Sequence, residues 1–391
     1  MKLCKQALAE VGVTLPNILL PADSVDLHRF SVIACDQFTA QPAYWQDVAQ
    51  IVGDACSTLH MTLPEIYLTE NNDDAINRIN ATMWQYLEKH LLVDIGETFV
   101  YLRRSTSAGV RQGLIVALDL EQYDYTKHAK SMIRATEGTI VERLPPRIKI
   151  RSGAPLETPH IMVLIDDRKN RLMGRLAKQI ETMECLYDLT LMKNGGHSTG
   201  YRVDAPKLVL EIAQILKEIK LQGGDNFLFA MGDGNHSFAA AKACWDAIKN
   251  TLTPEERESC PARYALAELV NLYDPALTFE PIHRLLYNVD PDAVERALDF
   301  DASNPPDAQI LQPKLDDWLK SHPEAELEYI HGEQECRELG DKPDRLAIVF
   351  PEFDRDSLFA VVRQKGALVR KSFSMGEARD KRYYLECRKI K

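Results

Sequence analysis

The 391-residue sequence lacks the features that mark secreted, membrane-bound or zinc-stabilised proteins. Its eight cysteines include no Cys-x-x-Cys pair, and its ten histidines form no His-x-x-x-His or Cys/His cluster, so we expect reduced thiols and no structural zinc. No apolar run approaches the roughly 18 residues that span a bilayer. Glu10 interrupts the apolar stretch near the start, which argues against a signal peptide. We therefore expect a soluble, cytoplasmic protein.

Positive charge is also in deficit. The sequence has 47 Lys and Arg against 58 Asp and Glu, which gives a formal net charge of -11. Such a chain repels polyanions at long range, so nucleic acid and acidic membranes are not expected partners, although a local basic site is compatible with this charge. No feature of the sequence specifies an oligomeric state.

The composition, 45% hydrophobic and 27% charged, is typical of a globular protein. Strand-like and helix-like patterns alternate along the chain, so we expect an α/β fold (mixed α+β) with central mixed sheets flanked by helices. A polar, proline-bearing stretch begins near residue 290. We therefore predict a main α/β domain over residues 1–290 and a smaller C-terminal α+β unit over 291–391, integrated with it.

Hydrophobic periodicity and turn residues predict the individual elements. We expect hairpins at 99–118 and at 189–203, the second turning at Asn194-Gly195, and helices at 42–52, 73–92, 169–185, 206–220, 310–319 and 377–387. Buried strands are expected at 161–165, 227–231 and 264–272, and strands of the C-terminal unit at 327–330, 346–350 and 358–362.

The most informative segment is the junction Gly232-Asp233-Gly234-Asn235-His236-Ser237, between a buried strand and a helix. The free N–H groups of such a helix start form an anion site that the helix dipole reinforces. Asp233 would act there as a cap, a metal ligand or a base, and His236 would bind an anion or move a proton. The alternative is that Asp233 or Asn235 simply caps the helix and His236 is an exposed polar residue. The junction is neither a P-loop nor a full dinucleotide fingerprint.

A second candidate feature is the basic segment from Arg143 to Arg151. In an extended strand Arg147, Lys149 and Arg151 would share one face and could neutralise a polyphosphate. The alternative is a solvated edge strand whose cations discourage aggregation. Just before it, Arg134 and Glu137 flank a turn, and Glu137 is the preferred general base if burial brings its pKa near the working pH.

Two further positions are candidate site residues. Asp36 follows a short apolar run, where a carboxylate could hold Mg²⁺ or merely form a turn. The pair His283-Arg284 could bring an arginine to the same site, or could lie over the core at the end of a loop. The C-terminal cations, including Lys371 and Lys381, could attract an anion, but a solvated helix face is the preferred interpretation.

The junction resembles the Asp-Gly-His-His-Arg signature of the domain-of-unknown-function 1015 family of uncharacterised prokaryotic proteins, with Asn235 and Ser237 in place of the first histidine and the arginine. The resemblance continues through Cys35-Asp36-Gln37-Phe38 with Tyr44-Trp45, Arg134 to Pro146, Val270 to Arg284, and Lys371 to Ala378. It therefore covers almost the whole chain and implies a family but not an activity. It also places a motif histidine at His197, which would otherwise be an exposed hairpin residue.

A more distant resemblance is to the ParB and sulfiredoxin superfamily, in which a glycine and histidine/arginine motif at a helix start binds nucleotide phosphates and which includes kinases of free serine. Ser237 in place of the arginine removes a bidentate phosphate clamp. The positive charge would then have to come from other segments.

Together these features and resemblances predict an enzyme that binds a small phosphorylated or anionic ligand. The specific expectation is a nucleotide-dependent phosphotransferase that uses ATP or ADP with Mg²⁺. Its substrate would be a small hydroxy or amino acid such as serine or phosphoserine. The alternative is a non-catalytic regulatory protein that binds a nucleotide or phosphometabolite. The expected catalytic residues are Asp233, His236 and Glu137, and the expected metal ligand is Asp36. The expected ligand-binding residues are Gly232, Gly234, Asn235, Ser237, Arg134, Arg143, Arg147, His197, His283 and Arg284.

Overall fold

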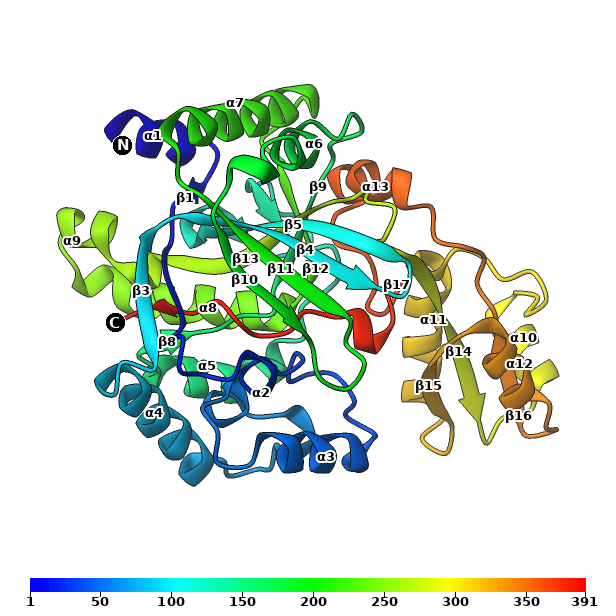
Figure 1. Cartoon of the computed structure of the whole chain (residues 1–391). Coiled ribbons are helices and arrows are strands. Elements are labelled where there is room, and N and C mark those ends of the chain that lie inside the picture. The colour runs from blue at the N-terminus through cyan, green and yellow to red at the C-terminus, as the bar shows by residue number, and fades with distance from the viewer.

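A ten-stranded mixed sheet forms the centre of the protein in the computed structural model, which describes residues 1–391 (Figure 1). The strand order is β10 (Cys185–Thr190), β11 (His197–Val203), β4 (Phe99–Thr106), β5 (Gly109–Asp119), β13 (Tyr264–Asn271), β9 (Met162–Ile165), β12 (Phe229–Asp233), β7 (Ile133–Arg134) and β6 (Tyr123–Asp124), with β1 (Val13–Thr14) paired to β5. The first five strands pair antiparallel with one another, β13 is parallel to β9, and β9 is antiparallel to β12. This arrangement confirms the expected mixed α/β fold.

The alternation of side chains along β4 and β5 explains why the sheet is covered on both faces. Phe99 and Tyr101 belong to one core cluster, whereas Val100 and Leu102 belong to another. Because successive side chains of a strand point to opposite faces, one apolar run supplies both cores. The first core contains residues of α7 (Pro206–Gln222) and α8 (Asn235–Ile248). The second contains residues of α3 (Pro42–Val52), α4 (Asp73–Glu88) and the last ten residues of the chain.

Thirteen α-helices surround the sheets. Those of the first 250 residues are α1 (Lys2–Ala9), α2 (Leu27–Phe30), α3 (Pro42–Val52), α4 (Asp73–Glu88), α5 (Leu144–Gly153), α6 (Arg171–Ala177), α7 (Pro206–Gln222) and α8 (Asn235–Ile248). They are followed by α9 (Pro254–Ser259), α10 (Pro291–Leu298), α11 (Ala308–Lys320), α12 (Glu333–Gly340) and α13 (Leu358–Lys365). None of these helices combines the length and the apolar character that crossing a membrane requires.

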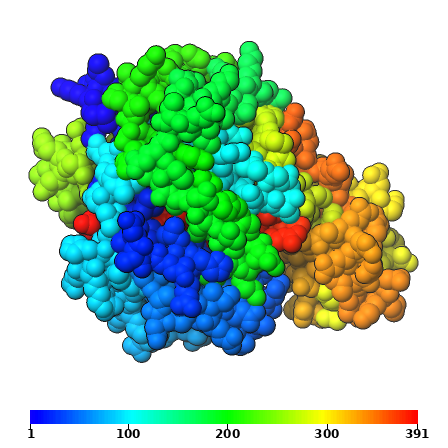
Figure 2. All heavy atoms as spheres, viewed as in Figure 1, coloured from blue at the N-terminus to red at the C-terminus, as the bar shows by residue number.

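A smaller unit stands beside the main body as the yellow and orange lobe of Figure 2. Its sheet has the order β15 (Glu326–His331), β14 (Phe279–Tyr287) and β16 (Arg345–Ile348), with β17 (Phe373–Met375) also paired to β14. The chain then returns to the main body, where β18 (Arg388–Lys389) pairs with β8 (Leu156–Glu157) near the paired strands β2 (Asn17–Pro21) and β3 (Leu92–Glu97). The chain therefore passes from the main body into the smaller unit after β13 and later returns to the main body.

Four expected elements differ from the structure. The helix expected at 169–185 ends at Ala177, and Cys185 already begins β10. The basic segment 143–151 is not extended but lies in α5, because Pro145 and Pro146 occupy the first helical positions, where no N–H is needed. Residues 358–362 are helical in α13 rather than a strand, and their Leu358, Phe359 and Val362 face a core cluster at helical spacing. Residues 377–387 contain only one 3₁₀ turn, Ala378–Asp380, because the segment after it is held extended by buried contacts.

Candidate functional site

The junction between β12 and α8 forms the floor of the candidate site. Gly234 precedes the helix with φ of 77°, and a Cβ atom there would lie 3.0 Å from the Cα of Ile161, so only glycine fits. No side chain caps α8. Asp233 instead accepts the N–H of Gly234 through Oδ1 at 2.9 Å. The expected alternative, in which Asp233 or Asn235 caps the helix, is therefore wrong, and the first N–H groups of α8 remain available to an anion.

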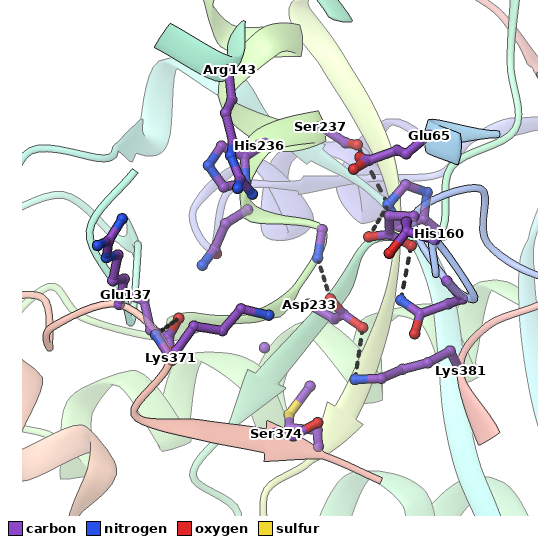
Figure 3. A pocket seen from close by; sticks show the side chains of 18 of the residues that line it. Glu65, Glu137, Arg143, His160, Asp233, His236, Ser237, Lys371, Ser374 and Lys381 are labelled. Carbon is purple, nitrogen blue, oxygen red and sulfur yellow. Dashed lines mark hydrogen bonds and ion pairs between the residues drawn. The ribbon is translucent and has the colours of Figure 1, made fainter. Parts of the chain in front are cut away.

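A cavity of about 420 Å³, which we call the central pocket, lies over this helix start. Figure 3 shows how side chains from separate segments meet there. The main unit contributes Asp36, Glu65, Glu137, Arg143, Arg147, His160 and the junction residues 232–237, and the smaller unit contributes Ile282, Tyr329 and His331. The segment that returns to the main body adds Arg370, Lys371, Ser374 and Lys381. The central pocket is therefore bounded by both units, and most of its lining is polar.

Cations gather on one side of the central pocket, around His236. Burial, followed by the charges of Arg147 and Arg143, lowers the pKa of His236 to about 4, and Lys371 acts in the same direction. The His236 Nε2 atom accepts the N–H of Ile140 at 3.3 Å, so the proton of the neutral ring is on Nδ1. A neutral histidine that is surrounded by cations is a hydrogen-bond donor to an anion and gains a proton when a dianion binds.

On the opposite side of the helix start, Asp36 and His160 form a close pair. The His160 Nε2 atom lies 3.4 Å from Asp36 Oδ2 and 3.5 Å from Ser237 Oγ, and its Nδ1 atom lies 3.0 Å from the Tyr384 hydroxyl. Burial acts to lower the pKa of His160, but the Asp36 carboxylate outweighs it and raises that pKa. Burial alone would raise the pKa of Asp36, but His160 and the amide of Gln37 hold it well below its usual range. Asp36 is therefore ionised.

A third group joins the junction to the C-terminal segment. Lys381 Nζ lies 3.1 Å from Asp233 Oδ2, and their side chains are 10% and 23% exposed. A further pair, Arg147 with Glu65, stands at the edge of the central pocket. Lys381 and Arg147 thus place positive charge beside the helix start, where the family motif has an arginine and this chain has Ser237.

Glu137 lies in the central pocket, and backbone groups of the C-terminal segment hold its carboxylate in place. Its two carboxylate oxygens accept the N–H groups of Lys371 and Ser372, each at 3.0 Å. Burial raises the pKa of Glu137, and these two hydrogen bonds offset part of that effect. A half-buried carboxylate of raised pKa, oriented by fixed donors, has the properties of a general base.

The central pocket contains carboxylates but no cluster of metal ligands. No group of three or more His, Cys, Asp or Glu side chains is arranged to hold a metal ion. Magnesium in phosphotransfer sites uses one or two carboxylates together with phosphate oxygens and water. The ionised Asp36 and the neighbouring Asp233, both in the central pocket, fit that smaller requirement.

Comparison with known proteins decides the family. The family described as "Protein of unknown function (DUF1015)" matches residues 19–385. The chain belongs to the DUF1015 family. No curated protein and no solved structure matches it.

In this DUF1015 protein, ten of the residues expected from the sequence line the central pocket. They are Asp36, Glu137, Arg143, Arg147, Gly232, Asp233, Gly234, Asn235, His236 and Ser237. They come from four separate segments of the chain, so the fold brings together positions that the sequence places up to about 200 residues apart.

Four expected residues lie outside the central pocket. Arg134 is buried against Phe227 and pairs with Asp225 at 2.8 Å. His197 lies on β11, half-exposed, and pairs with Asp188 at 2.5 Å. His283 accepts the N–H of Phe350.

Arg284, the fourth, is completely buried between the smaller sheet and α11 and donates to Gln312 at 2.6 Å. Its burial lowers its pKa to about 10. A guanidinium that is already surrounded by acceptors in the core has no free donor face for a ligand in the central pocket.

The cationic stripe expected at 147–151 is also corrected. Because α5 is a helix, Lys149 points away from the face that carries Arg147 and Arg151, which lie one turn apart. Arg147 reaches the central pocket, Lys149 pairs with Asp73 at the surface, and Arg151 pairs with Glu157 at 2.7 Å. Only one of the three cations, together with Arg143, serves the site.

The C-terminal cations differ from the expected solvated helix face. Lys381 is only 10% exposed and pairs with Asp233, and Arg382 is buried between Glu268 and Glu386. The reason is that Glu268 is fully buried on β13 and requires cationic partners.

His160 and Glu65 line the central pocket but are not among the site residues expected from the sequence. His160 precedes β9, and residues at the start of a strand are not expected at the ligand edge of a parallel sheet. However, β9 is antiparallel to β12, with Met162 opposite Asp233, so the start of β9 lies beside the end of β12. The motif Thr158-Pro159-His160 carries no local signal of this pairing.

Proposed function

We propose that this protein is a phosphotransferase that uses a nucleotide, ATP or ADP with Mg²⁺, to phosphorylate a small hydroxy or amino acid such as serine. The observation that carries the proposal is the convergence of an uncapped helix start with Arg143, Arg147, Lys371 and Lys381 in one pocket. Phosphoryl transfer depends on positioning and charge stabilisation, and these groups supply both.

In this proposal the transferred phosphoryl group lies against the N–H groups of α8. His236 donates from Nδ1, and Arg143 and Lys371 neutralise the charge that develops on the phosphoryl oxygens. Asp36 and Asp233 would hold Mg²⁺, which when bound neutralises the nucleotide phosphates. Lys381 holds the Asp233 carboxylate in place.

Glu137 is the proposed acceptor of the proton from the substrate hydroxyl. Its raised pKa brings it closer to neutral pH, and the N–H groups of Lys371 and Ser372 orient it while leaving a lone pair on each oxygen. The distant likeness of the junction to the ParB and sulfiredoxin superfamily, which includes free-serine kinases, is the reason for starting with serine.

The test is turnover followed by ³¹P NMR. Purified protein is incubated with ATP or ADP, Mg²⁺ and a panel of hydroxy acids and hydroxy amino acids that begins with serine, and with phosphoserine for the reverse reaction. Asp233→Ala and His236→Ala should abolish turnover, whereas Asp317→Ala, which removes an exposed carboxylate that pairs with Lys320, should leave it unchanged. If turnover occurs and persists in the first two variants, the assignment of the site is wrong.

The second candidate is a regulatory protein that binds a nucleotide or phosphometabolite without chemistry. One observation favours it: Asp36 already pairs with His160 and Asp233 with Lys381, and Ser237 cannot clamp a phosphate as arginine does. Binding of ATP, ADP or inorganic phosphate by calorimetry, with no turnover over the whole panel, would support this candidate. The absence of both binding and turnover would refute both.

A further inference from the structure

A second cavity lies directly behind the wall of the central pocket, and we call it the side chamber. Its volume is about 150 Å³. It has four lining residues in common with the central pocket, namely Glu65, Arg147, His160 and Ser237. These side chains therefore form a common wall of the two cavities.

The side chamber differs from the central pocket in chemistry. Most of its wall is apolar and includes Met61, Leu63, Met83, Ile150, Leu156 and Ala240. Its charged residues are already paired: Glu157 lies 2.7 Å from Arg151 and also contacts Arg388, and Arg147 contacts Glu65. Because these charges compensate one another within the wall, the side chamber requires no charge from a ligand and suits a neutral apolar group.

Helix α8 connects the two cavities. Ser237, in its first turn, stands in the common wall, and Ala240 lines the side chamber. Residues three apart lie on the same face of a helix. An anion held at the start of α8 can therefore extend an attached group past Ser237 and along this face towards Ala240.

The size of the side chamber sets the size of that group. An engineered apolar cavity of about 150 Å³ in another protein binds benzene. A compact ring or branched chain of roughly six carbons therefore fits a cavity of this size.

We infer that the acceptor of the proposed phosphotransfer carries a compact apolar group about the size of a benzene ring, and that this group occupies the side chamber. The inference rests on the proposed function, because the phosphorylated end of the same molecule occupies the central pocket. The product is then a phosphomonoester with an apolar substituent, and serine, which has no such substituent, is a minimal acceptor.

Calorimetric titration with two phosphomonoesters tests this inference without requiring turnover. Methyl phosphate and phenyl phosphate carry the same charged group and differ in the size of the apolar group. Phenyl phosphate should bind at least about tenfold more tightly, because the ring leaves water for the side chamber. Equal binding of the two esters overturns the side-chamber inference alone. If neither ester binds, the phosphate site of the proposed function is refuted as well.

A filled side chamber provides the second test. Ala240→Leu should reduce the preference for phenyl phosphate to within about twofold and leave the affinity for methyl phosphate unchanged. Ala247→Leu, on the exposed part of the same helix, is the matched control and should keep the full preference. Ala154→Val, which also narrows the side chamber, replaces Ala240→Leu if circular dichroism shows that the latter does not fold. A preference that survives in a folded filled variant contradicts the inference.

Discussion

Glu268 provides the sharpest test of how the C-terminal segment is held against the large sheet. This glutamate is fully buried on β13 and lies 3.3 Å from Arg111 Nε and 3.0 Å from Arg382 Nη1. The side chains of the two arginines are only 3% and 4% exposed. Glu268→Gln keeps the shape of the side chain and removes its charge, so the buried Arg111 loses its counter-charge and Arg382 keeps only that of Glu386.

Removal of one partner from a buried ion pair costs about 3–5 kcal/mol, and we expect a loss of this size in the free energy of unfolding. That is a large part of the roughly 5–15 kcal/mol that stabilises a typical domain. Glu377→Gln is the matched control, because it breaks the pair with Arg379, whose side chain is 53% exposed. The control should cost no more than about 1 kcal/mol.

The measurement is urea unfolding at pH 7 followed by circular dichroism. Burial acts to raise the pKa of Glu268, but Arg111 and Arg382 outweigh it and lower that pKa. The stabilisation by the charge of Glu268 is therefore complete above the ordinary glutamate pKa of roughly 4.3 and is lost as the pH falls below it. The difference in the free energy of unfolding between the wild-type protein and Glu268→Gln should accordingly become smaller in acid. A loss below about 1 kcal/mol at pH 7 would show that the two arginines find other counter-charges, and would refute the reasoning.

Three further predictions concern the site. Lys381→Met should weaken phosphate binding by roughly 10- to 100-fold in a calorimetric titration, because the Asp233 carboxylate beside the helix start loses its counter-charge and repels the anion, whereas Lys320→Met, at an exposed position, should have no effect. Sulfate, which stays a dianion, should bind more tightly as the pH falls from 7 to 5, because the low pKa of His236 rises when the anion binds. His236→Asn should remove most of this pH dependence, and an unchanged dependence would contradict the assignment. Burial raises the pKa of Cys35 to about 12, so iodoacetamide at pH 8 should modify the exposed Cys185 and leave Cys35 unmodified in a mass spectrum.

The location of the central pocket suggests why the C-terminal chain returns to the main unit. The segment from Lys371 to Lys381 orients Glu137 through two backbone N–H groups and pairs with Asp233. Immediately after it, Arg382 is anchored in the core of the main unit. A segment that is anchored by a buried ion pair, here Arg382 with Glu268, positions the pocket residues more precisely than a free loop does.

The sequence by itself determined the class of the fold and the centre of the site. Hydrophobic periodicity identified the buried strand before Gly232 and the helix after it, because one run is apolar throughout and the next repeats at helical spacing. The glycine at 234 indicated the turn between them, and the structure requires glycine there for both its backbone angle and its space.

Only the tertiary structure decided which other residues reach that site. His160 comes to the end of β12 because β9 runs antiparallel to it, and strand direction depends on how distant segments pair. The cations at 147–151 separate because two prolines start a helix, whose geometry turns Lys149 away from the face of Arg147 and places Arg151 one turn further along that face. Lys381 joins Asp233 because Arg382 is required by a carboxylate that is buried more than a hundred residues earlier in the chain. Local patterns are set by neighbouring residues, whereas these contacts depend on charges and strands that meet only after folding.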